Sequence, residues 1–184
     1  MIRPAAYDAR SVRLLLSSLA EHYAGTYGAH DLDQDDPTDY RAPTGGVRLG
    51  YEDGAPVALA CWRRHGPGVC ELRRFYVVPT ARGRGWARRL LVEASAAASA
   101  AGYSRAVCAT VAGDGLAGML GLDVRPIAPY GPYADLPGVG YFELAMVGAP
   151  ASTAATPWRP LTYGAPGRDV TAGVPSPARI NAVT

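Results

Sequence analysis

Residues 71–91 read ELRRFYVVPTARGRGWARRLL, and this stretch decides the fold class. The β-branched and aromatic residues of positions 69–78 are typical of a strand, which Pro79 ends. A turn with Gly83 and Gly85 follows, and apolar residues at helical spacing predict a helix over residues 88–101. A further strand is expected at residues 103–109. The order strand, turn, helix, strand predicts a crossover between two parallel strands.

The segments on both sides of this crossover are expected to add antiparallel strands. Five segments have the residue types and the turn boundaries of strands: residues 2–5, 47–51, 57–63, 124–127 and 139–146. The turn signal Glu52-Asp53-Gly54 predicts a hairpin between the second and third of them. A helix with its apolar residues on one face is expected to end at about residue 23.

Length and composition indicate one folded domain with an appendage. A chain of 184 residues has the length of a single domain. After Val147, Pro, Ala, Thr and Gly dominate, and no amphipathic period is visible. We therefore interpret residues 1–147 as the domain and residues 148–184 as a C-terminal tail.

Charge and residue usage disfavour several classes of protein. A net charge of +2 is too small for a typical nucleic-acid-binding protein. No apolar run approaches the length of a membrane-spanning helix, and the N-terminus lacks an apolar signal region, so a cytoplasmic location is expected. The three cysteines show no C-x-x-C spacing and the histidines do not cluster, so no metal site is assigned. The chain has no lysine, which excludes a Walker-type lysine.

The turn before the predicted helix could bind an anion. The first N–H groups of a helix lack intrahelical partners and carry partial positive charge. Gly83 and Gly85 would let the backbone approach a phosphate, and Arg82 and Arg84 add charge. A pyrophosphate is the natural ligand. The alternative is a tight turn whose arginines lie in solvent.

The same stretch resembles the coenzyme A-binding core of the GNAT acyltransferases. The signature R/Q-x-x-G-x-G/A of that family falls on Arg82, Gly85 and Ala87, with E-L-x-R-x-Y-V-x-P before it and L-L after it. The resemblance extends over residues 1–147 and includes a subgroup of small bacterial members. It implies an α/β fold with a mixed, mostly antiparallel, twisted sheet, a central parallel strand pair and helices on both faces.

The resemblance implies acetyl-CoA as co-substrate and assigns residues to it. The pyrophosphate would lie on the turn at residues 82–87, which carries the signature and is called the signature turn below. The pantetheine arm would lie along the end of the preceding strand. A backbone N–H near Val77 would polarise the thioester carbonyl. The residues assigned in this way are Tyr76, Val77, Val78, Arg82, Gly83, Arg84, Gly85, Trp86, Ala87 and Arg88.

The catalytic assignments also follow from the resemblance. Glu71 matches the glutamate of the family on this strand and is the candidate base, and strand alternation is expected to place it on one face with Arg73, Phe75 and Val77. The alternative is that Glu71 pairs with Arg73, Arg63 or Arg64 and has no catalytic role.

The tyrosine that often protonates the leaving thiolate in this family has no counterpart in residues 116–122. Either another tyrosine substitutes, with Tyr130, Tyr133 and Tyr141 as the candidates, or the thiolate leaves into water without a proton donor. The alternative for each is an aromatic packing residue.

The function implied is transfer of an acetyl group from acetyl-CoA to a primary amine, most simply that of a small molecule. The alternatives are acetylation of a protein N-terminus or lysine, and an acyl-CoA-binding module without catalysis. An acidic loop of Asp31, Asp33, Asp35, Asp36 and Asp39 would attract a cationic acceptor, or is merely solvated. A homodimer is left open.

Overall fold

The computed structural model describes residues 1–27, 32, 35–111, 124–135 and 138–146. Within them lie seven strands, two α-helices and three short 3-10 helices. In chain order the elements are β1 (Ile2–Ala5), α1 (Arg10–Tyr27), η2 (Pro37–Tyr40), β2 (Gly45–Glu52), β3 (Ala55–Gly66), β4 (Val69–Val77), η3 (Pro79–Ala81), α2 (Trp86–Ala100), β5 (Arg105–Val111), β6 (Val124–Pro126), η4 (Gly131–Tyr133) and β7 (Val139–Ala145). The predicted tail at residues 148–184 lies outside the described residues.

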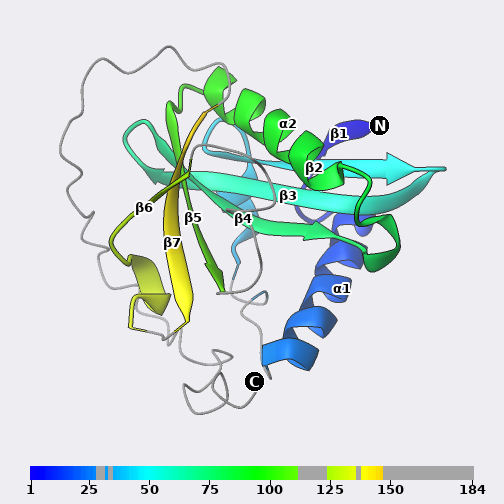
Figure 1. The fold of residues 1–184 in the computed structure, drawn as a ribbon. Helices are drawn as coiled ribbons and strands as arrows, with labels where there is room; N and C mark the ends of the chain where they lie inside the picture. Colours follow the sequence, from blue (N-terminus) through cyan, green and yellow to red (C-terminus); the bar gives the residue numbers. More distant parts are fainter. Residues whose placement is uncertain (28–31, 33–34, 112–123, 136–137, 147–184) are drawn as a thin grey trace.

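The strands form one mixed sheet in the order β1-β2-β3-β4-β5-β7-β6 (Figure 1). Every neighbouring pair is antiparallel except β4 and β5, which are parallel and joined through α2. The predicted fold class, with its parallel pair inside an otherwise antiparallel sheet, is therefore confirmed. The β2–β3 hairpin turns at Asp53 and Gly54, both with positive φ, as its sequence predicts.

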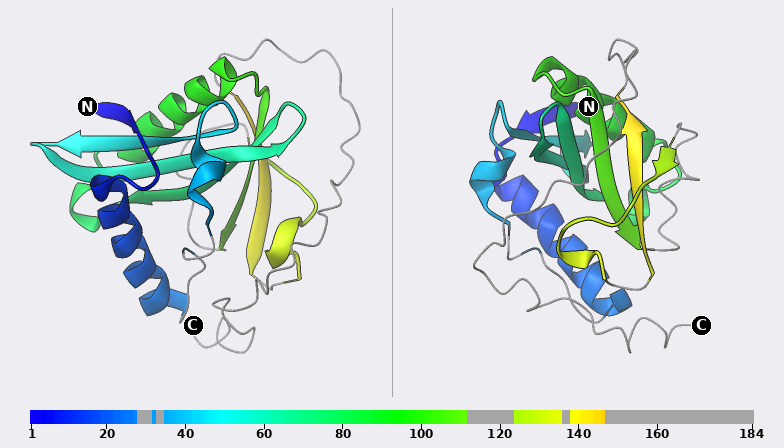
Figure 2. Two further views of the ribbon diagram at one scale, coloured as in Figure 1. Left: turned by 180° about the vertical axis from the view of Figure 1, so that it is seen from behind. Right: turned by 90° about the vertical axis from the view of Figure 1, so that its left-hand side faces the viewer.

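The two α-helices cover opposite faces of the sheet (Figures 1 and 2). Alternation along β3 explains this arrangement, since Leu59 and Cys61 pack with α1 whereas Ala58, Ala60 and Trp62 pack with α2. Because both faces of β3 are covered, the strand is apolar on both sides. Two apolar cores form in this way, and the central strands are buried between them.

Glycines define both ends of α2. Gly85, in the left-handed conformation, is the N-cap, so the helix begins at Trp86, two residues earlier than predicted. At the other end Gly102 also has positive φ, and the Tyr103 N–H donates to the Ala98 carbonyl at 3.1 Å. That 6→1 bond is the one expected of a glycine-terminated helix.

None of the described helices is long and apolar enough to cross a membrane.

The close contact between Gly50 and Trp86 gives a test of how α2 is seated on the sheet. A Cβ added at Gly50 would lie 2.6 Å from Cζ3 of Trp86, which is itself buried. We expect Gly50→Ala to lower the free energy of unfolding by about 1–3 kcal/mol, since the indole cannot move without displacing the start of α2. Chemical denaturation measures this.

Gly25→Ala is the matched control, because Gly25 lies in α1 and an added Cβ there meets nothing within 4 Å. That variant should be neutral or up to about 1 kcal/mol more stable. Equal stability of the two variants would show that the indole does not pack on Gly50.

Candidate functional site

Strands β4 and β5 pair over only three residues each and then diverge. Val69–Glu71 of β4 lies beside Arg105–Val107 of β5, and the pairing ends there although both strands continue (Figure 1). Residues 108–111 of β5 go on pairing with β7, and residues 72–77 of β4 go on pairing with β3. Among the described strands, none pairs with this edge of β4 beyond Glu71, close to the signature turn.

A β-bulge in β4 lies just beyond Arg73, two residues after the last of these pairs. Cys61 lies opposite Arg73 and Leu59 opposite Tyr76, so β4 has one more residue than β3 over this span. Arg74 has a φ of 52°, which is uncommon for a residue other than glycine. A bulge bends a strand and shifts its alternation by one position.

The expected alternation along β4 is therefore wrong beyond Arg73. Glu71 and Arg73 share one face of the sheet as expected, but Phe75 and Val77 lie on the other face, in the apolar core that includes Leu90 and Leu91 of α2. Tyr76 takes the α1 face instead and packs with Leu19. A sequence pattern of period two cannot reveal an inserted residue, which explains the error.

The bulge also decides where the backbone of Val77 points. The Val78 N–H donates to the Val57 carbonyl at 2.9 Å, so Val78 occupies a hydrogen-bonded position of the β3–β4 ladder. These positions alternate in an antiparallel pair, and Val77, opposite Ala58, occupies the other kind. Its N–H and carbonyl thus point away from β3, and the carbonyl accepts from Nε of Arg82 at 3.1 Å.

The signature turn presents backbone N–H groups to solvent. Gly83 and Gly85 are exposed, both have a φ of 76°, and no side chain caps α2 at Gly85. The first helical bond runs from the Arg89 N–H to the Gly85 carbonyl, so the four N–H groups of residues 85–88 precede the helical ladder. A turn of this kind can bind an anion.

Arginine side chains surround the turn but differ in what they contact. Arg82, Arg84 and Arg88 are exposed. Nη1 of Arg84 is 2.9 Å from Oε2 of Glu52, so the positive charge of Arg84 is partly neutralised by that carboxylate. The Arg89 guanidinium lies 3.8 Å from the centre of the Trp86 ring, a cation–π contact.

Two of the residues assigned to coenzyme A by resemblance are held by the protein core. The Trp86 side chain is buried, and Tyr76 packs with Leu19 and Leu32. Val77, Val78 and Ala87 are half-buried. For Trp86 in particular, the backbone at the start of α2, and not the indole, is available to a ligand.

Glu71 is buried in a charged network. Its Oε2 accepts from Nε of Arg63 at 3.0 Å and lies 3.7 Å from Nη1 of Arg73. Of the three arginines that the sequence offered as partners, Arg63 and Arg73 pair with Glu71. Nη1 of Arg63 also binds Asp39 at 3.1 Å, so this one guanidinium joins two carboxylates.

The described carboxylates of the acidic loop are engaged within the protein. Asp36 accepts from the Thr38 N–H at the start of η2, and Asp39 binds Arg63. Asp35 accepts from Nε of Arg74 and from the Tyr7 hydroxyl, both at 2.6 Å. These three carboxylates therefore do not form a free attracting surface, and Asp31 and Asp33 lie outside the described residues.

Asp35 is the most tightly held of these carboxylates. Burial alone would raise the pKa of Asp35, but the guanidinium of Arg74 and its hydrogen bond hold the pKa below its usual value. The Tyr7 ring stacks on Tyr40 at 4.2 Å between ring centres. No sequence signal marked Asp35 or Arg74 as partners, since they are 39 positions apart.

Tyr130 and Tyr133 lie on the same face of the sheet as Glu71. Tyr130 is buried and packs with Val107, the residue paired with Glu71, and its ring lies 4.8 Å from that of His65. Tyr133 is half-buried at the end of η4.

The further candidate, Tyr141, is less suited to donate a proton. Its hydroxyl is buried without a hydrogen-bond partner among the described residues, and burial raises its pKa to about 12.

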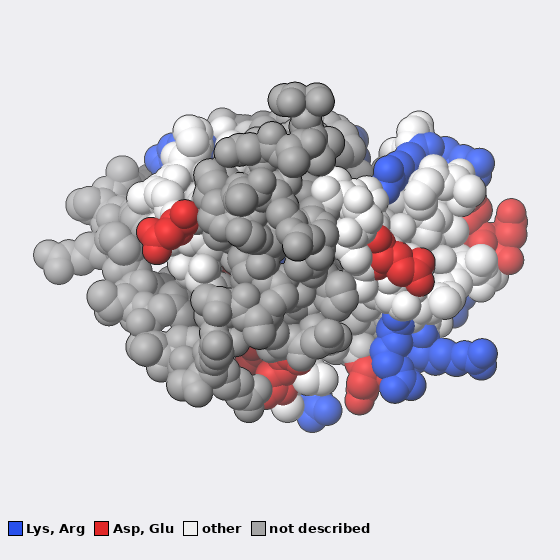
Figure 3. All heavy atoms as spheres, turned by 90° about the horizontal axis from the view of Figure 1, so that it is seen from below, with Lys and Arg blue, Asp and Glu red and all other residues white. Residues whose placement is uncertain are grey.

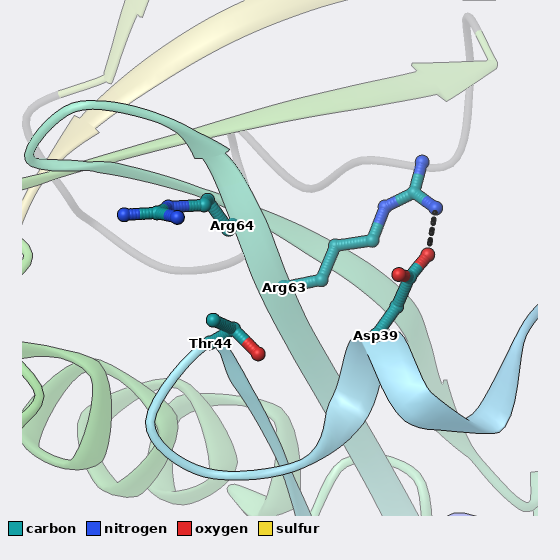
Figure 4. Close-up of a pocket in the computed structure, with 4 residues that line it drawn as sticks. All are labelled: Asp39, Thr44, Arg63 and Arg64. Carbon is teal, nitrogen blue, oxygen red and sulfur yellow. Dashed lines mark hydrogen bonds and ion pairs between the residues drawn. The ribbon is translucent and has the colours of Figure 1, made fainter.

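A polar depression lies beside the charged network of Glu71 and Arg63. It has a volume of about 330 Å³ and is lined by Asp39, Thr44, Arg63 and Arg64 (Figure 4). Arg63 thus connects the depression to Glu71. Figure 4 shows the Arg63–Asp39 ion pair on one side and the Arg64 side chain turned away from it.

The charged surface of the described residues carries both signs. Seen from below, acidic and basic side chains alternate around the described part of the molecule (Figure 3). Within that part, no group of three or more His, Cys, Asp or Glu side chains is arranged to hold a metal ion.

Several solved structures share this fold. An acetyltransferase of the GNAT family from Staphylococcus aureus Mu50 is 14% identical, with a TM-score of 0.61 over 79% of this chain and 99% of that one. Ribosomal-protein-alanine N-acetyltransferase from Brucella melitensis is 20% identical, with a TM-score of 0.58 over 79% and 99%.

A third structure, N-acetylglutamate synthase from Neisseria gonorrhoeae in complex with coenzyme A and N-acetylglutamate, is 13% identical. Its TM-score is 0.57 over 79% of this chain and 35% of that one. At these identities the likeness shows the fold alone. A comparison with curated proteins finds no match.

The sequence model of the acetyltransferase (GNAT) family matches residues 16–119, which include β4, the signature turn, α2 and β5. With more than half of the chain matched and the fold agreeing, the chain belongs to the GNAT acetyltransferase family.

Proposed function

We propose that this protein transfers an acetyl group from acetyl-CoA to the primary amine of a small molecule. The observation that carries the proposal is the geometry at the end of β4. There η3 and the signature turn connect the outward-pointing backbone of Val77 to a helix start whose four N–H groups precede the helical ladder.

The residues of the turn fit the pyrophosphate of coenzyme A. Gly83 and Gly85 expose the backbone, and a Cβ added at either would point into open space. Arg82 and Arg88 supply positive charge close to the unpaired N–H groups. Residues 76–78 would hold the pantetheine arm, and the Val77 N–H would stabilise negative charge on the thioester oxygen.

The proposed roles of the charged residues follow from their positions. Glu71 is the proposed base, because it belongs to the last residue pair of β4 and β5, where the two strands separate. An alkylammonium has a pKa of roughly 10, so the acceptor must lose a proton before it attacks the thioester carbon. Tyr133, less buried than Tyr130, is the better placed of the two to protonate the departing thiolate.

The described carboxylates of the acidic loop support a small acceptor. A basic protein substrate would be attracted by free carboxylates, but Asp35 and Asp39 are paired with arginines and Asp36 caps a helix.

Thiol release from acetyl-CoA should therefore be faster with small primary amines than with peptides that present an N-terminus or a lysine. Faster release with the peptides would contradict the proposed acceptor, and no release with any amine would favour an acyl-CoA-binding module.

Two glycines that flank α2 test the anion site. We expect Gly85→Ala to raise the Kd for coenzyme A about 5- to 30-fold in titration calorimetry, because an alanine at positive φ costs about 1–2 kcal/mol. Gly102→Ala is the matched control, since Gly102 ends the same helix and also has positive φ. Both variants should have a lower free energy of unfolding, but only Gly85→Ala should have a lower affinity for coenzyme A. A similar affinity for both would remove the turn from the binding site.

A pair of carboxylates tests the role of Glu71. We expect Glu71→Gln to lower kcat about 100-fold or more, which is the usual effect of losing a general base, and to leave the Kd for coenzyme A unchanged. Asp39→Asn is the control, because Asp39 is the other carboxylate bound to Arg63. If Asp39→Asn lowers kcat as much, Glu71 acts only as a counterion of Arg63.

A further inference from the structure

The bulge in β4 places a large side chain in an unfavourable backbone conformation. Arg74 has a φ of 52° and is buried, between Glu71 and the end of the strand. The left-handed region brings the Cβ of an L-residue too close to its own backbone, so glycine is the residue usually found there. Something outside β4 must therefore hold Arg74 in place.

The orientation of the β4 backbone depends on this extra residue. Without it, Tyr76 and Val77 would exchange faces, and the Val77 N–H would turn toward β3. With it, Val77 points to the edge of β4 that faces away from β3. The bulge also begins just beyond Arg73, two residues after Glu71, where the pairing of β4 with β5 ends.

Asp35 binds Arg74 from outside β4. Its Oδ2 is 2.6 Å from Nε of Arg74, and both side chains are at least 95% buried. The Tyr7 hydroxyl donates to the same oxygen at 2.6 Å, and the ring of Tyr7 is stacked on Tyr40. Asp35 thus connects the segment before α1 and the segment before η2 to the centre of β4.

We propose that Asp35 is a positioning residue: by binding Arg74 it maintains the bulge, and the bulge turns the amide of Val77 outward for the thioester. This inference rests on the proposed acetyl transfer. Asp35 acts through Arg74 and the backbone, and makes no contact with the reacting atoms. The competing explanation is that the Asp35–Arg74 pair only stabilises the fold.

Two double variants separate these explanations. Asp35→Asn/Arg74→Gly and Asp35→Asn/Arg74→Ala both remove the ion pair and differ by one methyl group. Glycine accepts the φ of the bulge without a penalty, whereas alanine does not. The positioning role predicts that the glycine variant binds acetyl-CoA at least fivefold more tightly than the alanine variant. A merely stabilising pair predicts equal affinities.

Amide hydrogen exchange, measured by NMR without acetyl-CoA, gives a second readout. In the unaltered protein the Val77 amide should exchange faster than those of Tyr76 and Val78, because only the latter two point toward β3. The glycine variant should keep this order. In the alanine variant the order should be lost or reversed, since a strand without its bulge directs Val77 at β3. An unchanged order in the alanine variant overturns the proposal.

Controls distinguish the possible failures. Asp36→Asn, in the same loop but bound to Thr38, should change neither readout. If the unaltered protein does not bind acetyl-CoA, the proposed function fails, and the exchange order still tests the bulge.

If the double variants do not fold, Tyr7→Phe, which removes one hydrogen bond to Asp35, should weaken binding about twofold or more and speed exchange at Tyr76 and Val78. The matched control is Tyr40→Phe, because the Tyr40 hydroxyl is buried without a partner among the described residues. Equal behaviour of these two single variants overturns the proposal.

Discussion

The structure depends on how briefly β4 and β5 pair. Three residue pairs join the two halves of the sheet, and then each strand follows a different neighbour. A longer parallel ladder would have closed the edge of β4 and directed its free N–H groups at β5. Because the pairing ends early, no strand in the described part of the chain covers that edge next to the start of α2.

Two backbone features with positive φ convert this edge into a candidate binding site. The glycines of the signature turn let the chain reverse and start α2 with unpaired N–H groups. The bulge at Arg74 turns Val77 outward on the strand that leads into the turn. The first feature needs no support from elsewhere, since glycine adopts positive φ freely. The second feature places an arginine, Arg74, at positive φ, and this arginine forms a buried ion pair with Asp35.

The sequence predicted the elements that depend on local chemistry. The strand before Pro79, the glycine turn, the helix and the parallel strand after it all appear in the structure, because residue type, spacing and turn residues determine each of them locally. Glycine at 102 likewise predicted the end of α2. The resemblance to the GNAT family, carried by Arg82, Gly85 and Ala87, is confirmed over residues 16–119.

The features that could not be predicted arise from contacts between distant segments. The pairing of Asp35 with Arg74 joins residues 39 positions apart, and neither residue type signals the other. The same contact explains why the Asp35 carboxylate is not free, and the bulge explains why Phe75 and Val77 turn away from Glu71. The roles of Glu71, Tyr130 and Tyr133 stay predictions, because burial and pairing alone do not distinguish a catalytic group from a structural one.

The most direct test of the account is to follow the backbone amide resonances by NMR during a titration with coenzyme A. We expect the largest shifts at Gly83, Gly85 and residues 86–88 together with Val77, and no shift at Gly102 at the other end of α2. Shifts concentrated elsewhere on the sheet, or none at the start of α2, would contradict it.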